Sequence, residues 1–501
     1  MTTAPPGAPA PAEPKPAFAR FLGKFTVLFG AARELWLIFA IKLVTIAAYS
    51  VTNKTLVLWL SSELGYSDRG ALGLVAAWSL SITVFTLLVG SLTDAIGLRR
   101  TFFLGTGVCI FARTVMAFTT IKPLAIACGL FPLAIGEALG APVLVAAVRR
   151  YSNTRQRSIS FSLFYTMMNV GFLVAAFLFD LLRRDLGEYR HFLLPVLGVQ
   201  LTTYRALFLV SLLLECSLLP LIWCLREGAE ATDQGLRLVP IERKYRHESL
   251  WNSLQLTVRD TAKDTIRLFT GLLRQEGFYR LLAFLMLIAF LKLIFMQIDY
   301  VFPKFGIREL GERAPVGMLS GINYALVILM VPIIGALTQR FPAYTMVILG
   351  GAISAASVFV MALPTAWFVP WAQGLPGHWL GHGYLRLEGT IHPYYVMSAL
   401  FVVLLSFGEA FYSPRVYEYA AAIAPKGQEA SYGALSYVPF LLAKLLVGTV
   451  SGTLLAKYCP EQGVRHSGTM WLFVGLLATV APVGLIAFRR YIRVREAGRE
   501  N

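Results

Sequence analysis

Long apolar segments dominate the hydrophobic pattern of this chain. Each runs for about 20 residues or more, the length that an α-helix needs to cross roughly 30 Å of hydrocarbon. The pattern predicts twelve membrane-spanning helices, at residues 34–60, 70–93, 101–119, 124–148, 160–181, 205–226, 279–302, 316–338, 345–363, 392–423, 432–457 and 468–489. The predicted fold class is therefore an all-α membrane protein.

One long polar interruption, residues 227–278, divides the spans six and six. We expect one six-helix bundle at 34–226 and a second at 279–490. Residues 1–33 and 491–501 are expected to be cytosolic tails, the first disordered or amphipathic and rich in proline and alanine. A cytosolic amphipathic helix in the interruption is favoured over a dedicated lipid-binding or regulatory helix, because its apolar stripe is short. The stripe consists of Trp251, Leu254, Val258, Leu268, Phe269 and Leu272.

The two predicted halves are related in sequence. Residues 90–105, GSLTDAIGLRRTFFLG, align without gaps on residues 335–350, GALTQRFPAYTMVILG. The heptapeptide GEALGAP at 136–142 returns as GEAFYSP at 408–414. Two matches in the same order indicate a pseudo-symmetric repeat rather than a shared apolar composition. Six-plus-six repeats around a site at the membrane midplane are typical of secondary transporters.

Composition and charge agree with a membrane protein. The chain is 56% hydrophobic and 15% charged, with a formal net charge of +17. With the N-terminus inside, 27 of the 45 Lys and Arg residues fall in cytosolic segments and 13 at outer loops and helix ends. This bias follows the positive-inside rule, so it argues against nucleic acid as the partner and places both termini in the cytosol. The Pro/Ala-rich N-terminal tail favours the inner membrane of a bacterium. The five scattered cysteines, and His378 with His382, do not form a metal-binding pattern.

Ionisable residues near the middle of apolar helices are the candidate chemistry. Each costs about 3 kcal/mol at the bilayer centre, so they must pair or line a wet cavity. Fixed salt bridges between helices are one interpretation, and a solute and ion pathway is the other. Polar stripes at helical spacing in several spans favour the pathway. Its candidate residues are Glu409, Glu137, Lys292, Lys444, Arg113, Lys42, Tyr49, Tyr165, Asn169, Gln297, Asp299 and Tyr437.

The stretch GSLTDAIGLRR resembles the loop 2–3 signature of the major facilitator superfamily, G-x-L-a-D-x-x-G-r-r. The resemblance implies twelve helices in two bundles and a loop that holds the cytosolic gate against a helix of the other half. It also implies that helices 4 and 10 line the cavity, so that Glu137 and Glu409 face each other. In the second copy Gln339 stands where Asp94 would be repeated. The gating motif consists of Gly90, Asp94, Gly97, Arg99 and Arg100.

Two further stretches resemble the proton-dependent oligopeptide transporters of that superfamily. GEAFYSP is similar to the helix 10 pattern G-E-x-x-x-S-P, and FYTMMNVG at 164–171 to the helix 5 pattern F-Y-x-x-x-N-x-G. The resemblance implies that Glu409 binds the amino end of a peptide. The chain departs from the family where KLVTIA at 42–47 replaces E-x-x-E-R-F, Ala141 replaces a carboxylate-binding lysine, and Met296 replaces the acid before Gln297.

These features predict a secondary active transporter that moves a small zwitterionic or anionic organic solute, such as a di- or tripeptide, by alternating access. We expect a monomer without a cofactor, coupled to protons through Glu137 or Glu409. A facilitator or exporter of an unrelated solute, and a non-transporting receptor on the same fold, are the alternatives. An enzyme is not expected, because the chain has no phosphate-binding loop and no hydrolase motif.

Overall fold

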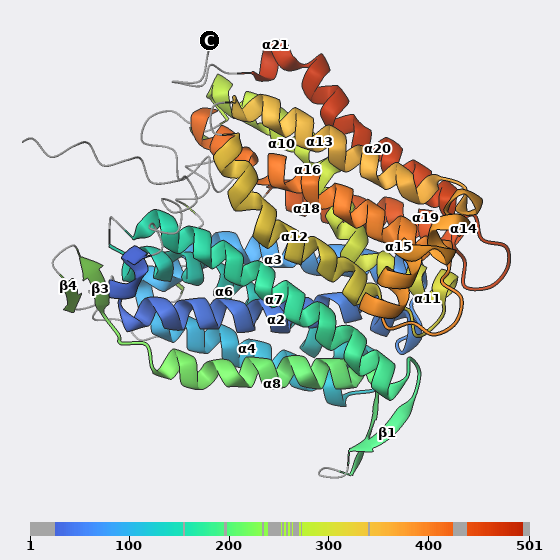
Figure 1. The fold of residues 1–501 in the computed structure, drawn as a ribbon. Helices are drawn as coiled ribbons and strands as arrows, with labels where there is room; N and C mark the ends of the chain where they lie inside the picture. The colour runs from blue at the N-terminus through green and yellow to red at the C-terminus, as the bar shows by residue number, and fades with distance from the viewer. Residues whose placement is uncertain are drawn as a thin grey trace, which may run out of the picture.

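The computed structural model describes residues 26–153, 156–194, 198–232, 235–238, 273–338, 341–423 and 438–493, with isolated positions between 252 and 271. Within some helices, including residues 87–96, only the backbone is described. The described part is almost entirely helical (Figure 1), which confirms the predicted fold class.

Eleven helical segments in the described residues are long and apolar enough to cross a membrane. Each coincides with a predicted span to within a few residues. The first half contains α2 (Arg33–Ser62), α3 (Asp68–Ile96), α4 (Leu98–Phe118), α5–η2–α6 (Lys122–Tyr151), α7 (Arg157–Leu186) and α8 (Thr203–Trp223). The second half contains α10 (Glu276–Tyr300), α12 (Val316–Leu337), α13 with η3 (Ala343–Ala362), α16 (Pro393–Ile423) and α20 (Ser467–Ala487).

The twelfth predicted span, 432–457, is divided in the structure. Residues 438–458 form α18 (Val438–Leu446), the π-helical turn η6 (Val447–Ser451) and α19 (Gly452–Tyr458). Residues 432–437, and with them Tyr437, lie outside the described residues. A π-helical turn shifts the register of the backbone hydrogen bonds, and such turns are frequent at functional sites.

The sequence repeat is visible as the same helix crossing in both halves. A Cβ added to Gly136 of α6 would lie 3.0 Å from the carbonyl oxygen of Gly105 in α4. A Cβ added to Gly408 of α16 would lie 2.7 Å from the carbonyl oxygen of Gly350 in α13. Only glycine allows the backbones to approach this closely. Two helices therefore cross at a pair of glycines in each half, at Gly105 with Gly136 and at Gly350 with Gly408. The two pairs correspond to each other in the sequence repeat.

The two halves touch mainly at one end of the bundle. We call it the distal end, because it lies away from the first residue of α2 and the last residue of α20; the opposite end is the proximal end. The chain reaches the distal end at Ser62, Tyr300 and Ala362. There α7 packs against α12, and α3 against η6 and α19, in agreement with the arrangement in Figure 1.

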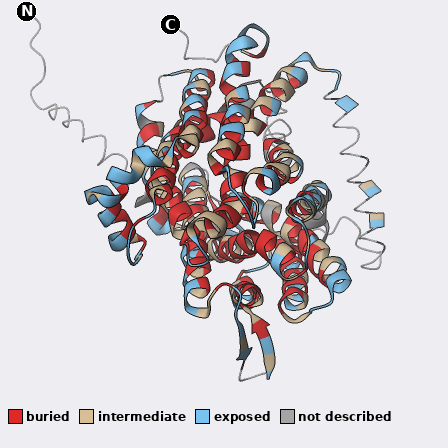
Figure 2. Ribbon diagram, turned by 90° about the vertical axis from the view of Figure 1, so that its right-hand side faces the viewer, coloured by how far each residue is buried: buried red, intermediate tan, exposed pale blue. Residues whose placement is uncertain are grey.

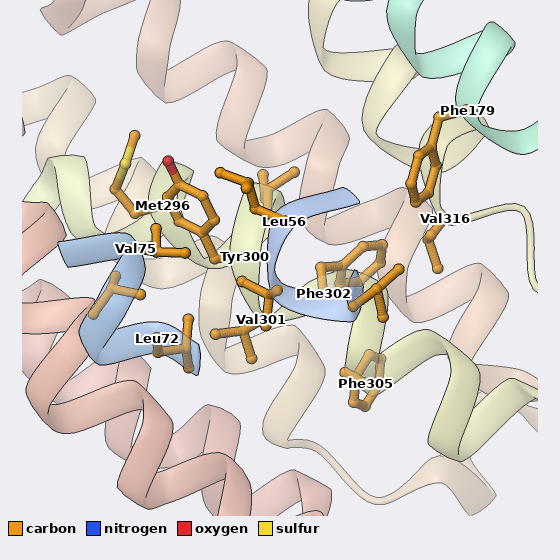
Figure 3. Close-up of a cluster of buried hydrophobic side chains, with 14 of the residues drawn as sticks. Leu56, Leu72, Val75, Phe179, Met296, Tyr300, Val301, Phe302, Phe305 and Val316 are labelled. Atoms are coloured by element: carbon orange, nitrogen blue, oxygen red, sulfur yellow. The ribbon is translucent and has the colours of Figure 1, made fainter. Parts of the chain in front are cut away.

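The buried hydrophobic side chains form three clusters, and most of the helix surface that faces another helix is buried (Figure 2). The largest cluster joins both halves at the distal end, where Leu56, Leu72 and Phe179 of the first half meet Phe302 and Val316 of the second (Figure 3). The other two lie toward the proximal end, and each draws its buried residues from one half alone. The described core therefore joins the halves distally.

Several elements were not predicted from the sequence. The predicted tail 1–33 contains the short helix η1 (Thr26–Gly30), whose Leu28 is buried in the core of the first half. The predicted linker begins with a hairpin of β3 (Ala229–Thr232) and β4 (Gly235–Leu238), and its predicted helical stripe lies outside the described residues. A second hairpin, β1 (His191–Leu194) with β2 (Val199–Thr202), precedes α8. The second half also has α11 (Phe302–Leu310), η4 (Thr365–Phe368), α14 (Val369–Gln373), α15 (Leu375–His378), η5 (Trp379–Tyr384) and α21 (Arg489–Ile492).

Candidate functional site

A buried guanidinium organises the interior of the first half. Arg113 of α4 donates from Nη2 to Glu137 Oε1 of α6 at 2.6 Å and from Nε to Ser211 Oγ of α8 at 2.7 Å. Its Nη1 lies 3.2 Å from Glu215 Oε2, also on α8. The side chains of Arg113, Glu137 and Glu215 are 0%, 11% and 4% exposed. We call these four residues the Arg113 cluster; it holds two carboxylates around one cation.

Two lysines lie close enough to Glu137 to act on it electrostatically. Lys42 of α2 and Lys444 of α18 both attract its carboxylate. Lys42 Nζ lies 4.5 Å from the centre of the Phe164 ring. Lys444 Nζ lies 3.3 Å from Tyr49 Oη, so a cation of the second half reaches helix α2 of the first. The Arg113 cluster is therefore within electrostatic reach of a lysine from each half.

The second repeated glutamate has different partners. Glu409 Oε2 accepts a hydrogen bond from Asn323 Nδ2 of α12 at 3.1 Å, and the same amide donates to Ser406 Oγ at 3.0 Å. Lys292 of α10 attracts Glu409 electrostatically. Its Nζ lies 5.1 Å from the centre of the Tyr412 ring, a cation–π geometry. We call Glu409, Asn323 and Lys292 the Glu409 cluster.

A third group of charges joins the two halves directly. Lys54 of α2, with a side chain only 2% exposed, lies 3.1 Å from Asp299 Oδ1 of α10. Its ammonium also donates to Ser320 Oγ of α12 at 3.2 Å. Beside it, Tyr300 Oη donates to Asn53 Oδ1 at 2.7 Å. A buried pair of this kind is sensitive to the loss of either partner, because the remaining charge is left without compensation.

Further polar contacts join the two halves at the distal end, beyond the level of Lys54 and Asp299. Arg308 Nη1 of α11 lies 2.9 Å from Asp68 Oδ2 of α3, and Lys304 also pairs with Asp68. Burial lowers the pKa of the Lys304 ammonium, while Asp68 acts in the opposite direction. Asp180 of α7 accepts from the backbone N–H groups of Gly317 and Met318, at 3.0 and 2.5 Å. Because these N–H groups belong to the first turn of α12, Asp180 caps a helix of the other half.

Arg183 adds to this closure from α7. Its guanidinium donates to Glu188 Oε2 at 2.6 Å and to the backbone carbonyl oxygens of Glu312 and Ala314 at 3.1 and 3.3 Å. The polar contacts between the halves that are named above lie between the level of Tyr49 and the distal end. The described contacts thus seal the bundle distally and reach inward as far as Lys444.

The structure brings together most of the pathway residues predicted from sequence, but in separate groups. Arg113 and Glu137 bond directly, and Glu409 and Lys292 lie near each other. Glu137 and Glu409 were expected to face each other, yet each carboxylate hydrogen-bonds to a residue of its own half. Gln297 donates to Ser451 within the second half. Asn169 donates to the backbone oxygen of Tyr165, a local bond within α7 at 3.1 Å.

The gating motif is only partly described. Gly97 has a φ of +89° at the turn between α3 and α4, a conformation that favours glycine. Gly90 and Asp94 fall in the stretch of α3 where only the backbone is described. The guanidinium carbon of Arg99 lies 4.8 Å from the centre of the Trp223 ring, and Arg100 Nε 3.4 Å from Glu227 Oε1. Arg99 thus contacts the first half and Arg100 the first residue of the linker, whereas the resemblance implied that this loop contacts a helix of the second half.

The predicted list of pathway residues lacks several members of these groups, including Lys54, Glu215, Ser211 and Ser320. Lys54 was assigned to an outer helix end because it lies near the end of its span. Glu215 lies in the run LLLECSLL, where an acid among apolar residues carried the same signal as Glu137. Ser211 and Ser320 gave no signal, because serine is common in membrane helices, where its hydroxyl group hydrogen-bonds to the backbone of its own helix.

The two helical halves bury charges of both signs in their interiors and, at Lys54 and Asp299, between them. The family model of the Major Facilitator Superfamily matches residues 38–380. The chain therefore belongs to the Major Facilitator Superfamily, whose members are transporters and not enzymes. Comparison with curated protein sequences gives no significant match.

Transporters of the POT family are among the solved structures that share the fold. One is a POT family transporter in complex with 5-aminolevulinic acid, with 15% identity, a TM-score of 0.66, and coverage of 92% of this chain and 97% of that chain. Another, from a study of substrate recognition in proton dependent oligopeptide transporters, has 17% identity, a TM-score of 0.67, and coverage of 92% and 98%. A peptide transporter POT in complex with sulfate has 15% identity, a TM-score of 0.65, and coverage of 94% and 98%. At these identities the likeness establishes the fold alone.

Proposed function

We propose that the protein is a proton-coupled secondary transporter of small zwitterionic or anionic organic solutes, with short peptides and amino-acid derivatives as the first candidates. The observation that carries the proposal is the burial of charges of both signs inside each half and, at Lys54 and Asp299, between the halves. Ionisable groups inside a membrane bundle are expensive, and they persist where they bind ions or solutes. The resemblance of the helix 10 motif to that of the oligopeptide transporters supports the same class.

Glu409 is the proposed site for the amino group of the solute. One of its oxygens accepts a hydrogen bond from the neutral amide of Asn323, and an incoming ammonium would add a charge-assisted bond to the same carboxylate. Lys42 and Lys444, on different halves and both near Glu137, are proposed to attract the carboxylate of the solute. A solved structure of a POT family transporter contains 5-aminolevulinic acid, which carries both of these groups.

The Arg113 cluster is the proposed proton site. Glu137 and Glu215 share one guanidinium while both are nearly excluded from water. When two carboxylates share one cation in such a place, proton binding relieves the excess negative charge. The carboxylate of Glu137 lies on the side of the cluster that Lys42 and Lys444 approach. Protonation of Glu137 would weaken its hold on both lysines and leave them available for the solute.

Alternating access is proposed to proceed from the conformation in the structure, which is closed distally. Following the positive-inside rule, we assign the distal end to the outside and the proximal end, with both termini, to the cytosol of a bacterium. Opening distally requires the Lys54–Asp299, Asp68–Arg308 and Asp180–Met318 contacts to break. We propose a monomer as the unit of transport, because one chain carries both halves.

The test is uptake of a pool of di- and tripeptides into proteoliposomes, with and without an inward proton gradient. Wild type is compared with Glu409→Gln and, as a control for substitution of a glutamate, with Glu388→Gln in an exposed distal loop. We expect uptake driven by the gradient in wild type and in the control, and its loss in Glu409→Gln. Absence of uptake by folded wild type removes peptides as substrates. Uptake that ignores the gradient removes proton coupling.

One observation favours a second function, that of a facilitator without proton coupling. The position where the oligopeptide transporters carry the first glutamate of E-x-x-E-R-F holds Lys42, whose ammonium lies over the Phe164 ring. A facilitator would equilibrate the solute at the same rate whichever way the pH gradient points.

A further inference from the structure

The distal connection between α13 and α16 folds into a compact unit instead of an open loop. Residues 363–385 contain η4, α14, α15 and η5. Pro370 and Pro376 stand in the first turns of α14 and α15, where a missing N–H breaks no helical bond. A Cβ on Gly377 would collide with the backbone of Ala372, and one on Gly381 with Ile391. We call residues 363–385 the tryptophan platform.

The platform presents apolar side chains on its outer surface at intervals of four residues. Trp367, Trp371, Leu375 and Trp379 are 64%, 57%, 87% and 73% exposed. They belong to four successive short elements, η4, α14, α15 and η5, and each of these elements exposes one of them. Ala372, Leu380 and Leu385 of the same segment are buried against the protein. By contrast, Trp59, Trp78 and Trp471 are fully buried in the bundle.

The composition of the platform fits lipid better than water. Residues 363–385 contain no Asp, Glu, Lys or Arg, and charge resumes at the exposed residues Arg386 and Glu388. Tryptophan is enriched where a membrane meets water, because its ring is apolar and its N–H is polar. Backbone groups in that zone must be paired, and Gly374, His378 and Leu385 donate their N–H groups to Pro370, Gly374 and Leu380.

The platform is continuous with the surface of the bundle that faces lipid. η4 and α14 pack on α16, whose Leu400 and Phe407 are exposed apolar residues of a membrane span. Tyr384 Oη, at the end of η5, donates to the backbone oxygen of Met318 at 2.9 Å. The platform is thereby fixed to α12 at the closed distal end, at the level where the membrane spans end.

We propose that the tryptophan platform lies in the membrane itself, with Trp367, Trp371, Leu375 and Trp379 inserted at the headgroup–acyl boundary of the distal leaflet. It is then an interfacial anchor of the second half, and not a loop in water. A segment that exposes these apolar side chains, contains no Asp, Glu, Lys or Arg and pairs the backbone N–H groups named above fits that zone.

Tryptophan fluorescence of the full chain in lipid nanodiscs tests this placement. The platform signal is the difference in tryptophan fluorescence between wild type and the variant Trp367→Phe/Trp371→Phe/Trp379→Phe. It is measured once with lipids that carry brominated acyl chains and once with iodide in the water. We expect brominated lipid to remove the platform signal and iodide to leave it. The matched control is Trp471→Phe, whose difference signal from the buried ring should respond to neither quencher.

Two results would overturn the proposal. Quenching by iodide but not by brominated lipid would place the platform in water. Quenching by neither would mean that a second copy or another protein covers it. A second measurement needs no triple variant: Leu375→Cys and Glu388→Cys are labelled in nanodiscs with a maleimide that does not enter lipid, and the wild-type background is subtracted. Labelling of Glu388→Cys with loss of labelling at Leu375→Cys supports insertion, and equal labelling contradicts it.

Discussion

The two copies of the GEA motif keep one feature and differ in another. In both copies the glycine lies where its helix crosses another helix of the same half: Gly136 of α6 meets Gly105 of α4, and Gly408 of α16 meets Gly350 of α13. The next residue, a glutamate, meets Arg113 in the first half and the amide of Asn323 in the second. The backbone crossing needs glycine in either half, so it has persisted while the chemistry beside it diverged.

The divergence can be traced to single positions. At the offset of the aligned repeats, Cys109 corresponds to Ser354, and these two residues approach the glycines of their crossings in the same way. One turn further on, Arg113 corresponds to Val358, which is fully buried. The second half therefore lacks the cation that fixes Glu137, and its glutamate is left to a neutral partner and a lysine. We infer from this a fixed cluster in one half and an adaptable site in the other.

Arg113→Met should be the most damaging substitution in the comparison. It leaves Glu137 and Glu215 buried without their cation, and removal of one partner from a buried ion pair costs about 3–5 kcal/mol. We expect a large fall in the free energy of unfolding, measured by thermal unfolding in one detergent. Adding Glu137→Gln and Glu215→Gln to the same chain should restore much of the loss. Wild-type stability in the single variant would show that the cluster is not a structural unit.

The glycine crossings should respond alike in both halves, with a smaller loss. Gly136→Ala and Gly408→Ala each place a methyl group against a neighbouring helix, and overpacking of this kind costs roughly 1–3 kcal/mol. Gly140→Ala is the matched control, because its added Cβ has no atom within 4 Å. The same thermal unfolding assay applies. If Gly140→Ala were as damaging as Gly136→Ala, close packing would not explain the repeat.

Asn323→Leu should have the smallest effect on stability. It removes the hydrogen bonds to Glu409 and Ser406, and a hydrogen bond to a charged group contributes about 1.5–3 kcal/mol, offset here in part by the added apolar side chain. The expected signature is a modest fall in melting temperature with a large change in apparent affinity for the solute. A loss of stability equal to that of Arg113→Met would mean that both glutamates sit in equally rigid clusters.

The membrane spans and the repeat were predictable because they leave long signals. A span of about 20 mostly apolar residues is easy to detect in a sequence. The matching glycines and prolines of the repeat recur at fixed offsets. The partners of the buried charges were less predictable, since a helix pattern gives the face of a residue but not the neighbour it meets. Lys54 is the clearest case: its span was predicted, but its pairing with Asp299 depends on the docking of the two halves.

The short distal elements were not predicted for a different reason. The platform segment reads as a Gly- and Pro-rich loop, and its helices are four to six residues long. Turns of this length have no hydrophobic period that a sequence pattern can detect. Their order comes from packing on α16 and from the bond between Tyr384 and Met318, which only the folded chain reveals.

Transport by Glu137→Gln and Glu409→Gln in the same proteoliposomes tests most directly whether the two glutamates have different roles. Two assays with a radiolabelled dipeptide are needed: uptake driven by a proton gradient, and exchange of internal for external solute without a gradient. Glu137→Gln should lose driven uptake and keep exchange, because it removes the proton site and leaves the solute site. Glu409→Gln should lose both. Identical behaviour of the two variants in both assays would contradict the division of roles between the halves.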